Sequence, residues 1–176
     1  MENLLLENIH MFYPPFKIEG FMRESNAIEG EFEDGGARGR LNQGDIEAVH
    51  LILGCKNLTL ERLLKVHGKL GEYLEVNWAG RLRDVDVRVG AYKAPKWQNV
   101  PVLIADYIEK YPKMDSFEAY NEFEMIHPFQ DLNGRVGRLL WLKKALKEGY
   151  AFGLPFLQKY HYQCLDNFNS LIVKKC

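Results

Sequence analysis

The segment from His127 to Arg138, HPFQDLNGRVGR, gathers side chains that could carry out phosphoryl-group transfer. His127 titrates near neutral pH in its ordinary form and could accept a proton from a hydroxyl nucleophile. Asp131 could be the protein's share of a Mg²⁺ site, because Mg²⁺ keeps several waters and takes its other ligands from phosphates. Arg135 and Arg138 are three residues apart, so on a helix both guanidiniums could grip one anion. A base, a metal ligand and a charge clamp are the parts that this chemistry needs.

The chain has to turn between two helices inside this segment, and the turn creates an anion site. Pro128 disfavours helical geometry at the residue before it. We therefore predict a helix from Phe117 to Ile126, then a loop, and a second helix from Gly134 onward. Asn133 and Gly134 then lie where the first backbone N–H groups of a helix lack internal partners, at the positive end of its dipole. Such a terminus suits a phosphate, and the two arginines behind it favour a polyphosphate over a carboxylate.

Each of these residues also has an ordinary structural explanation. A histidine near a helix end is most often a structural polar residue. An aspartate and an arginine at a helix start are most often a cap and a surface ion pair. The functional interpretation therefore rests on the joint occurrence of these residues at these spacings.

Most other segments have the helical period of apolar residues, which predicts a mostly α fold. Thr59 can cap one helix, Pro101 can open another, and Asp115 or Ser116 can cap the helix that leads to His127. Gly149 can end the helix that follows the polar segment. The further helices that we predict cover Gln43–Leu53, Leu60–Leu70, Val100–Ile108 and Pro155–Leu171.

Two stretches break the helical period. Val85, Val87 and Val89 alternate with charged residues, and Gly90 follows as a turn signal, so we predict a short β-hairpin there. The stretch 33–44 is polar and rich in glycine, but it lacks the preceding strand and the GK[ST] of a phosphate-binding loop. We interpret it as a flexible connection.

The composition is that of one ordinary globular domain, with 176 residues of which 47% are hydrophobic and 27% charged. The net charge of −1 favours neither nucleic acid nor an anionic membrane as a partner. Lys143, Lys144 and Lys147 are interpreted as a solvated helix face. The cysteines lack disulfide or metal-ligand spacing, which fits a reducing compartment. With no secretory signal and no apolar run long enough to span a bilayer, we expect a soluble, cytoplasmic protein.

The segment HPFQDLNGRVGR resembles the Fic family motif HxFx[D/E]GNGRxxR, with leucine in place of the first glycine. The surroundings are also similar over roughly residues 59–165. The resemblance implies a mostly α Fic fold with a small β-hairpin flap, in which residues 1–176 form a single Fic domain. The motif positions that match are His127, Phe129, Asp131, Asn133, Gly134, Arg135 and Arg138.

Most characterised Fic proteins move AMP from ATP to a hydroxyl side chain of a target protein. The resemblance implies that His127 deprotonates the Ser, Thr or Tyr hydroxyl of the target. Asp131 would hold Mg²⁺ between the α- and β-phosphates, and Arg135 and Arg138 would bind the β- and γ-phosphates.

The resemblance also implies how the target and the adenine are held. The flap, about Val87 to Tyr92 and so including Val89 and Gly90, would align the target segment by strand-like pairing. Tyr162 is a candidate adenine contact after the motif helix, with core packing as its ordinary alternative.

Leu132 is the departure from the motif, next to the anion hole that Asn133 and Gly134 would form. If the position requires a positive φ, leucine is strained there by about 1–3 kcal/mol. If a negative φ suffices, leucine is tolerated and its side chain packs away from the nucleotide. A tolerated leucine leaves an AMP transferase, whereas a distorted hole leaves a weak binder or a different transferred group.

The upstream sequence SNAIEG, Ser25 to Gly30, is similar to the family's inhibitory pattern [S/T]xxxE[G/N]. The resemblance implies an inhibitory helix around residues 18–30. Glu29 would pair with Arg138 and occupy the place of the γ-phosphate. Its ordinary alternative is a solvated carboxylate at a helix end.

The sequence therefore predicts a protein adenylyltransferase that uses ATP and Mg²⁺, is autoinhibited by Glu29, and could also remove AMP from its target. The partner that the resemblance implies is a protein substrate, and the resemblance also allows a homodimer. The alternatives are a non-catalytic nucleotide-binding regulatory module and a Fic protein that transfers another phosphate-linked group.

Overall fold

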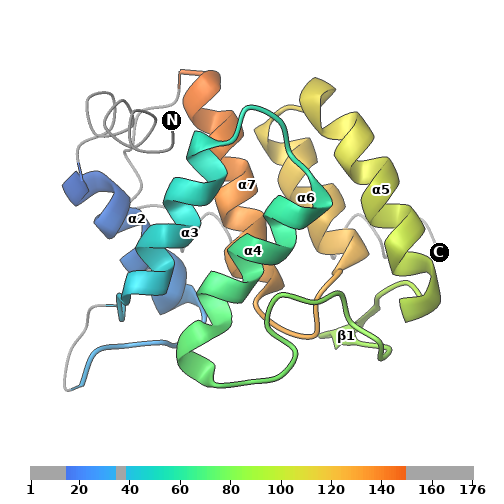
Figure 1. The fold of residues 1–176 in the computed structure, drawn as a ribbon, viewed down its shortest axis with the longest axis horizontal. Helices are drawn as coiled ribbons and strands as arrows, with labels where there is room; N and C mark the ends of the chain where they lie inside the picture. Colours follow the sequence, from blue (N-terminus) through green and yellow to red (C-terminus); the bar gives the residue numbers. More distant parts are fainter. Residues whose placement is uncertain (1–14, 35–38, 150–176) are drawn as a thin grey trace.

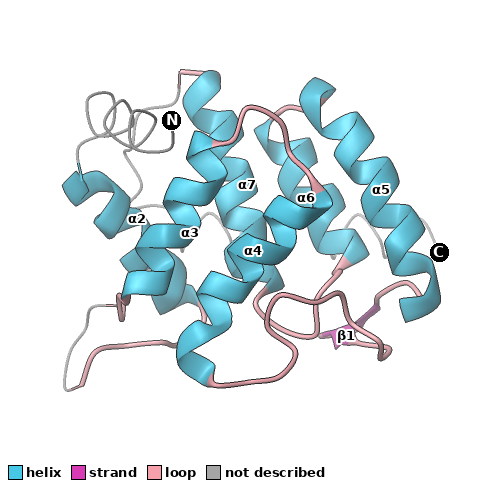
Figure 2. Cartoon of the chain, in the orientation of Figure 1, coloured by secondary structure: helices cyan, strands magenta, loops and turns pink. Residues whose placement is uncertain are grey.

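A computed structural model of the chain describes residues 15–34 and 39–149. The predicted helix over Pro155–Leu171 and the candidate Tyr162 lie outside the described residues. The described part is mostly helical, as predicted, with one two-stranded antiparallel hairpin (Figure 2). The α-helices are α2 (Pro15–Ile28), α3 (Gln43–Gly54), α4 (Leu60–Gly71), α5 (Val100–Lys110), α6 (Ser116–Ile126) and α7 (Asn133–Lys147). Single 3₁₀ turns follow or precede helices at η1 (Glu72–Leu74), η2 (Trp97–Asn99) and η3 (Tyr111–Lys113).

Local capping sets where several helices begin. The side chain of Thr59 accepts a hydrogen bond from the backbone N–H of Arg62, which confirms it as the cap of α4. Asp115, rather than Ser116, caps α6, and it forms a capping box with Glu118.

Helix α7 lies at the centre of the molecule (Figure 1). It packs beside α6 on one side and near α3 and α4 on the other, while α5 lies outside α6 and α2 lies at the opposite edge (Figure 1). The buried side chains form one core, to which α2 contributes Ile18, Phe21 and Met22, each at most 2% exposed. Helix α2 is therefore part of the core and not an appendage.

The hairpin pairs β1 (Arg88–Val89) with β2 (Tyr92–Lys93) around a two-residue turn that starts at Gly90, whose φ is +57°. Val85 and Val87 lie before the first strand, so the ladder is shorter than the alternation of valines suggested. The hairpin, the α6–α7 loop and the end of α2 all lie at the lower end of the molecule in Figure 1. This end carries the motif residues.

The prediction of a solvated lysine face on α7 was wrong for two of its three residues. Lys143 and Lys144 are 5% and 8% exposed. The ammonium of Lys143 donates to the carbonyls of Ile52 and Cys55 at the end of α3, and that of Lys144 donates to the carbonyls of Pro112 and Met114. Both lysines thus satisfy backbone carbonyls that no helix partner reaches, at ends where a positive charge is favourable.

None of the helices in the described residues is long and apolar enough to cross a membrane.

Candidate functional site

The α6–α7 loop is held by unusual backbone conformations at both of its ends. Helix α6 ends at Ile126, and the cap residue after it, His127, has a left-handed φ of +48°. Leu132, at the N-cap of α7, has a φ of +63°. Pro128 does end the helix as predicted, although His127 turns left-handed and not extended. Between the two ends, the side-chain amide of Asn133 pairs with both the N–H and the C=O of Phe129, each at 2.9 Å. The side-chain amide of Asn133 therefore fixes the loop, and of this residue only the backbone N–H remains to bind an anion.

His67 of α4 supports the loop by packing against Phe129. Its ring stacks on Phe129 with centroids 3.8 Å apart and planes 5° apart. Its Nδ1 accepts the N–H of Gly80 at 2.9 Å, so its Nε2 carries the proton and donates to the carbonyl of Asp131 at 3.2 Å. Burial lowers the pKa of His67 to about 4, so the ring is neutral at pH 7, as this tautomer requires.

The imidazole of His127 is mostly enclosed, with 15% of its side chain exposed. Burial lowers its pKa, and the backbone carbonyl of Glu124 partly offsets this effect. The ring is therefore neutral at pH 7 and able to accept a proton. Its Nδ1 lies 3.7 Å from Oε2 of Glu124, so a proton on Nδ1 would face Glu124 and leave Nε2 as the acceptor.

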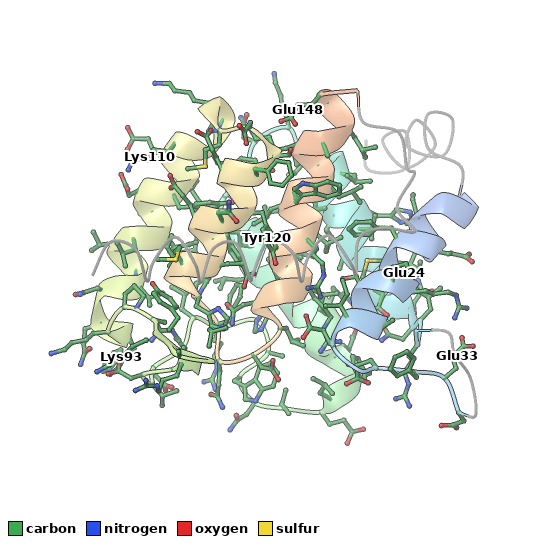
Figure 3. All side chains as sticks on the ribbon, turned by 180° about the vertical axis from the view of Figure 1, so that it is seen from behind. Glu24, Glu33, Lys93, Lys110, Tyr120 and Glu148 are labelled. Carbon is green, nitrogen blue, oxygen red and sulfur yellow. The ribbon has the colours of Figure 1, made fainter. Side chains whose placement is uncertain are left out.

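Glu124 is a second titratable group of the site. Its Oε1 is buried without a hydrogen-bond partner among the described residues. Burial raises the pKa of Glu124 to about 7, although Arg138 opposes this shift. The carboxyl fits only because residue 137 is glycine, since a Cβ there would lie 2.5 Å from Oε1 and 3.2 Å from the ring of Tyr120. Tyr120 lies at the junction of α6 and α7 (Figure 3).

The N-terminus of α7 lies directly after the loop. The first helical bond of this end runs from the N–H of Val136 to the carbonyl of Leu132, so the N–H groups of residues 133–135 have no acceptor within the helix. Asp131 is exposed at the same place, and its Oδ1 accepts the N–H of Leu132 at 2.6 Å. These groups could hold phosphate oxygens and one face of a Mg²⁺ ion.

Leu132 combines the two outcomes that the sequence left as alternatives. Its φ is positive, yet its side chain is 3% exposed and packs in the core near Gly71 of α4. A left-handed conformation costs a non-glycine residue about 1–2 kcal/mol. Burial of a leucine side chain contributes about 1.5–3 kcal/mol and offsets this cost. The loop therefore keeps a left-handed position 132 without glycine.

Arg138 joins α7 to the end of α2. It is 2% exposed, and it donates from Nε to Oγ of Ser25 at 2.8 Å and from Nη2 to the Ser25 carbonyl at 3.0 Å. Its Nη2 also donates to Oε1 of Glu29 at 2.6 Å. Glu29 lies in the turn after α2, one residue beyond the helix end at Ile28. A Cβ at Gly134 would lie 2.7 Å from this carboxylate and 2.9 Å from Nη1 of Arg138, so only glycine leaves room for the pair.

Arg135 makes different contacts, although it shares a helix with Arg138. Its Nη1 donates to the hydroxyl of Tyr73 in η1 at 2.7 Å, and its guanidinium lies 5.9 Å from the centre of the same ring. Its buried Nε has no hydrogen-bond partner in the described part of the chain. The structure thus places the two arginines at one end of α7 but commits each to a separate neighbour.

The flap residues lie at the edge of the site. Val89 in β1 is 38% exposed and Gly90 opens the turn, while the hydroxyl of Tyr92 donates to the carbonyl of Met125 in α6 at 3.0 Å. The hairpin is therefore tied to the helix that carries His127.

Sequence reasoning did not single out several residues that shape the site. His67 lies 60 positions before the motif begins, and Glu124 and Arg83 carried no signal except their positions next to the motif and the flap. A buried charge in these places looks like a surface charge in the sequence, because its burial depends on segments far along the chain.

The model of the Fic/DOC family matches residues 57–143, about half of the chain, and this span includes the whole segment from His127 to Arg138. Three solved structures have a similar fold. A Fic family protein from Desulfovibrio desulfuricans G20 is 23% identical with a TM-score of 0.65, over 97% of this chain and 65% of that one. A Fic domain-containing signaling protein from Bacteroides thetaiotaomicron VPI-5482 is 17% identical with a TM-score of 0.56, over 86% and 74%.

The third structure, Fic-1 from C. elegans (residues 134–508), is 18% identical with a TM-score of 0.58, over 80% of this chain and 51% of that one. This chain thus spans just under two thirds of the Desulfovibrio protein and about half of the C. elegans one. At these identities the structures show a shared fold. Together with the family match across the motif, they show that the chain belongs to the Fic/DOC family.

Proposed function

We propose that this protein transfers AMP from ATP to a Ser, Thr or Tyr hydroxyl of a target protein. Membership of the Fic/DOC family supports the coarser part of the proposal, a transferase that modifies proteins. ATP is proposed as the donor of the transferred group because of the burial and pairing of Arg138. This buried guanidinium, on the helix whose N-terminus follows the His127 loop, is held by a carboxylate from outside the motif. A cation in this place suits the terminal phosphate of a triphosphate.

In the proposed reaction, the hydroxyl oxygen of the target attacks the α-phosphorus of ATP. The bond between this phosphorus and the oxygen that bridges the α- and β-phosphates breaks, and pyrophosphate leaves with this oxygen and the electron pair of the bond. His127 accepts the proton of the hydroxyl, for which its lowered pKa keeps it neutral. The backbone N–H groups at the start of α7 and the guanidinium of Arg135 would bind the phosphate oxygens.

The donor set at Asp131 fits Mg²⁺ that is bound mainly by a nucleotide. In residues 15–34 and 39–149, no group of three or more His, Cys, Asp or Glu residues could hold a metal ion, so this part of the chain has no metal site made only of such side chains. Magnesium bound through one carboxylate and several phosphate oxygens does not need such a cage. Bound beside Asp131, the ion would neutralise charge on the phosphates.

We further propose that Glu29 inhibits transfer by occupying the phosphate-binding face of Arg138. Its hydrogen bond of 2.6 Å and the two bonds to Ser25 supply the guanidinium with acceptors that a γ-phosphate would otherwise provide. ATP could then bind only in a pose that does not present its α-phosphorus to the target.

The test is transfer from α-³²P-labelled ATP to proteins of a cell lysate. The Glu29→Gly variant should label a target about tenfold to a hundredfold faster than wild type, because a charge-assisted hydrogen bond of about 1.5–3 kcal/mol is removed. The double variant Glu29→Gly/His127→Ala should label nothing, and Glu31→Gly should behave as wild type.

Other results would identify the alternatives. ATP-dependent stabilisation without any labelled protein in the Glu29→Gly variant would indicate a nucleotide-binding regulatory module. Label transferred from the γ- but not the α-phosphate would indicate transfer of another phosphate-linked group.

The form that retains Glu29 could also catalyse removal of AMP. Glu29 would orient a water molecule that attacks the phosphorus of the AMP–target bond, releasing AMP and the free hydroxyl. An AMP-modified target that keeps its label when incubated with wild-type protein would contradict this second activity.

A further inference from the structure

Arg83 connects the flap to the backbone of the motif loop, although it lies outside the motif. Arg83 is 4% exposed, so its guanidinium is enclosed by protein. Its Nε donates to the carbonyl of His127 at 2.7 Å, and its Nη2 makes a longer contact of 3.4 Å with the carbonyl of Ile126. Its own backbone N–H donates to the carbonyl of Pro128 at 3.0 Å. One residue thus contacts three consecutive carbonyls at the end of α6.

The same guanidinium also holds both ends of the flap. Its Nη1 donates to the carbonyl of Val85, before β1, at 2.9 Å. Its Nη2 donates to the carbonyl of Pro95, after β2, at 2.6 Å. The planar fork of an arginine can serve these separate directions at once, whereas a lysine ammonium cannot reproduce the fork.

These contacts explain how His127 keeps its left-handed backbone. A φ of +48° costs a non-glycine residue about 1–2 kcal/mol and persists only where the surroundings determine it. Arg83 donates to the carbonyl of His127 and also contacts the carbonyls of the residues before and after it, Ile126 and Pro128. Its positive charge is favourable at the C-terminal end of α6. Without it, several carbonyls at this buried turn would lose their donor.

We propose that Arg83 is a positioning residue that sets the backbone of His127 and fixes the flap relative to it. The inference rests on the proposed function, because Arg83 would serve to bring the hydroxyl of a target segment, aligned along the flap, within reach of His127. Arg83 would act through His127 and the flap, with no direct contact to the nucleotide.

The test compares Arg83→Lys with Arg81→Lys, an exposed arginine of the same segment, in the Glu29→Gly variant. Transfer of AMP to lysate proteins should fall about tenfold or more in Arg83→Lys, as expected for a loss of about 1.4 kcal/mol or more in positioning. Affinity for Mg²⁺–ATP should stay within about twofold, because the α7 terminus and its arginines are untouched. Arg81→Lys should change neither quantity.

A second measurement does not depend on transfer. The ring ¹⁵N resonances of His127, assigned with His127→Ala, should shift in Arg83→Lys and remain in place in Arg81→Lys. If Glu29→Gly transfers nothing, the proposed function fails, but these resonances still test the role of Arg83. Unchanged resonances, or losses of ATP affinity and transfer that run in parallel with lowered thermal stability, would overturn the inference in favour of a merely structural arginine.

Discussion

His127 and Leu132 lie at the two ends of the motif loop, and both have a left-handed backbone. In the described ranges the other non-glycine residue with a positive φ is Glu75. At each end of the loop a different interaction compensates the strain. Donors from Arg83 hold His127, whereas burial of its own side chain holds Leu132. The loop conformation is therefore determined without a glycine at position 132.

The strain at Leu132 can be measured by comparing two truncations. Leu132→Ala removes the buried side chain and keeps the strain, whereas Leu132→Gly removes both. We expect truncation of this buried leucine to lower the free energy of unfolding by about 2–5 kcal/mol in the alanine variant. The glycine variant should be the more stable of the two, opposite to the ordinary order in which glycine costs about 0.5–1 kcal/mol relative to alanine. Urea unfolding checks this order, and a more stable alanine variant would contradict a strained position 132.

Glu124 should make the stability of the protein depend on pH. Its pKa rises from 4.5 in the unfolded chain to about 7 in the folded protein, so the folded state binds more protons between these values. Stability that is present below about pH 4.5 is therefore lost as the pH rises through 7, by an amount on the order of 3 kcal/mol.

Glu124→Gln should remove this loss. Its thermal stability should exceed that of wild type at pH 8, and the difference should shrink towards pH 4.5. Melting curves across this range check the sign, and comparison with wild type cancels the acid titration of His67, which both proteins share. A difference that stays constant with pH would show that Glu124 titrates normally.

At the scale of elements, α2 connects the candidate inhibitory residue to the core. Ile18, Phe21 and Met22 are buried, so the helix has a fixed position. Its end is fastened by Asn26, whose side-chain amide donates to the Arg40 carbonyl at 2.8 Å and to Oδ2 of Asp45 in α3 at 2.9 Å. Inhibition by Glu29 would thus depend on the start of α3 as well as on Arg138.

Removing this fastening should relieve part of the proposed inhibition. We expect Asn26→Ala to raise AMP transfer, but less than Glu29→Gly does, because the carboxylate remains and only its placement is loosened. In the Glu29→Gly variant the same change should have no further effect on transfer, since the two act on one contact.

Transfer from α-labelled ATP measures both values, with the exposed Gln43→Ala as the control. If the two changes raised AMP transfer additively in the double variant, Asn26 would act independently of Glu29.

At the scale of the whole molecule, segments that are distant in sequence meet at one end of the helical domain. The end of α2, the flap and the α6–α7 loop all lie at this end (Figure 1). Arg138 bonds to Ser25 and Glu29 more than a hundred positions away. Nucleotide binding and the arrangement of α2 should therefore be linked.

This linkage predicts a difference in ligand stabilisation. A ligand that binds only the folded state, as proposed for Mg²⁺–ATP, stabilises that state by an amount that grows with the ratio of ligand concentration to dissociation constant, about 2.7 kcal/mol at a hundredfold excess. The Glu29→Gly variant should therefore melt at a higher temperature with Mg²⁺–ATP than without it, by a larger margin than wild type. Calorimetry at one nucleotide concentration checks the two margins, and Arg138→Ala in the same variant should reduce the larger one. Equal margins in wild type and Glu29→Gly would contradict competition between Glu29 and the nucleotide.

The sequence alone determined the parts of the protein that depend on neighbouring residues. The period of apolar residues and the caps at Thr59 and Asp115 predicted the helices, because these interactions act within a few positions. The spacing of Arg135 and Arg138 likewise followed from one turn of helix, and the match to the Fic motif followed from the segment itself.

The tertiary structure decided what depends on contacts between distant segments. It buried Lys143 and Lys144, enclosed Glu124 so that its pKa rises, and brought Arg83 to the end of α6. It also showed that Leu132 is left-handed and buried at once. Burial and the satisfaction of backbone carbonyls are properties of the packed molecule, so no local pattern of residues could have revealed them.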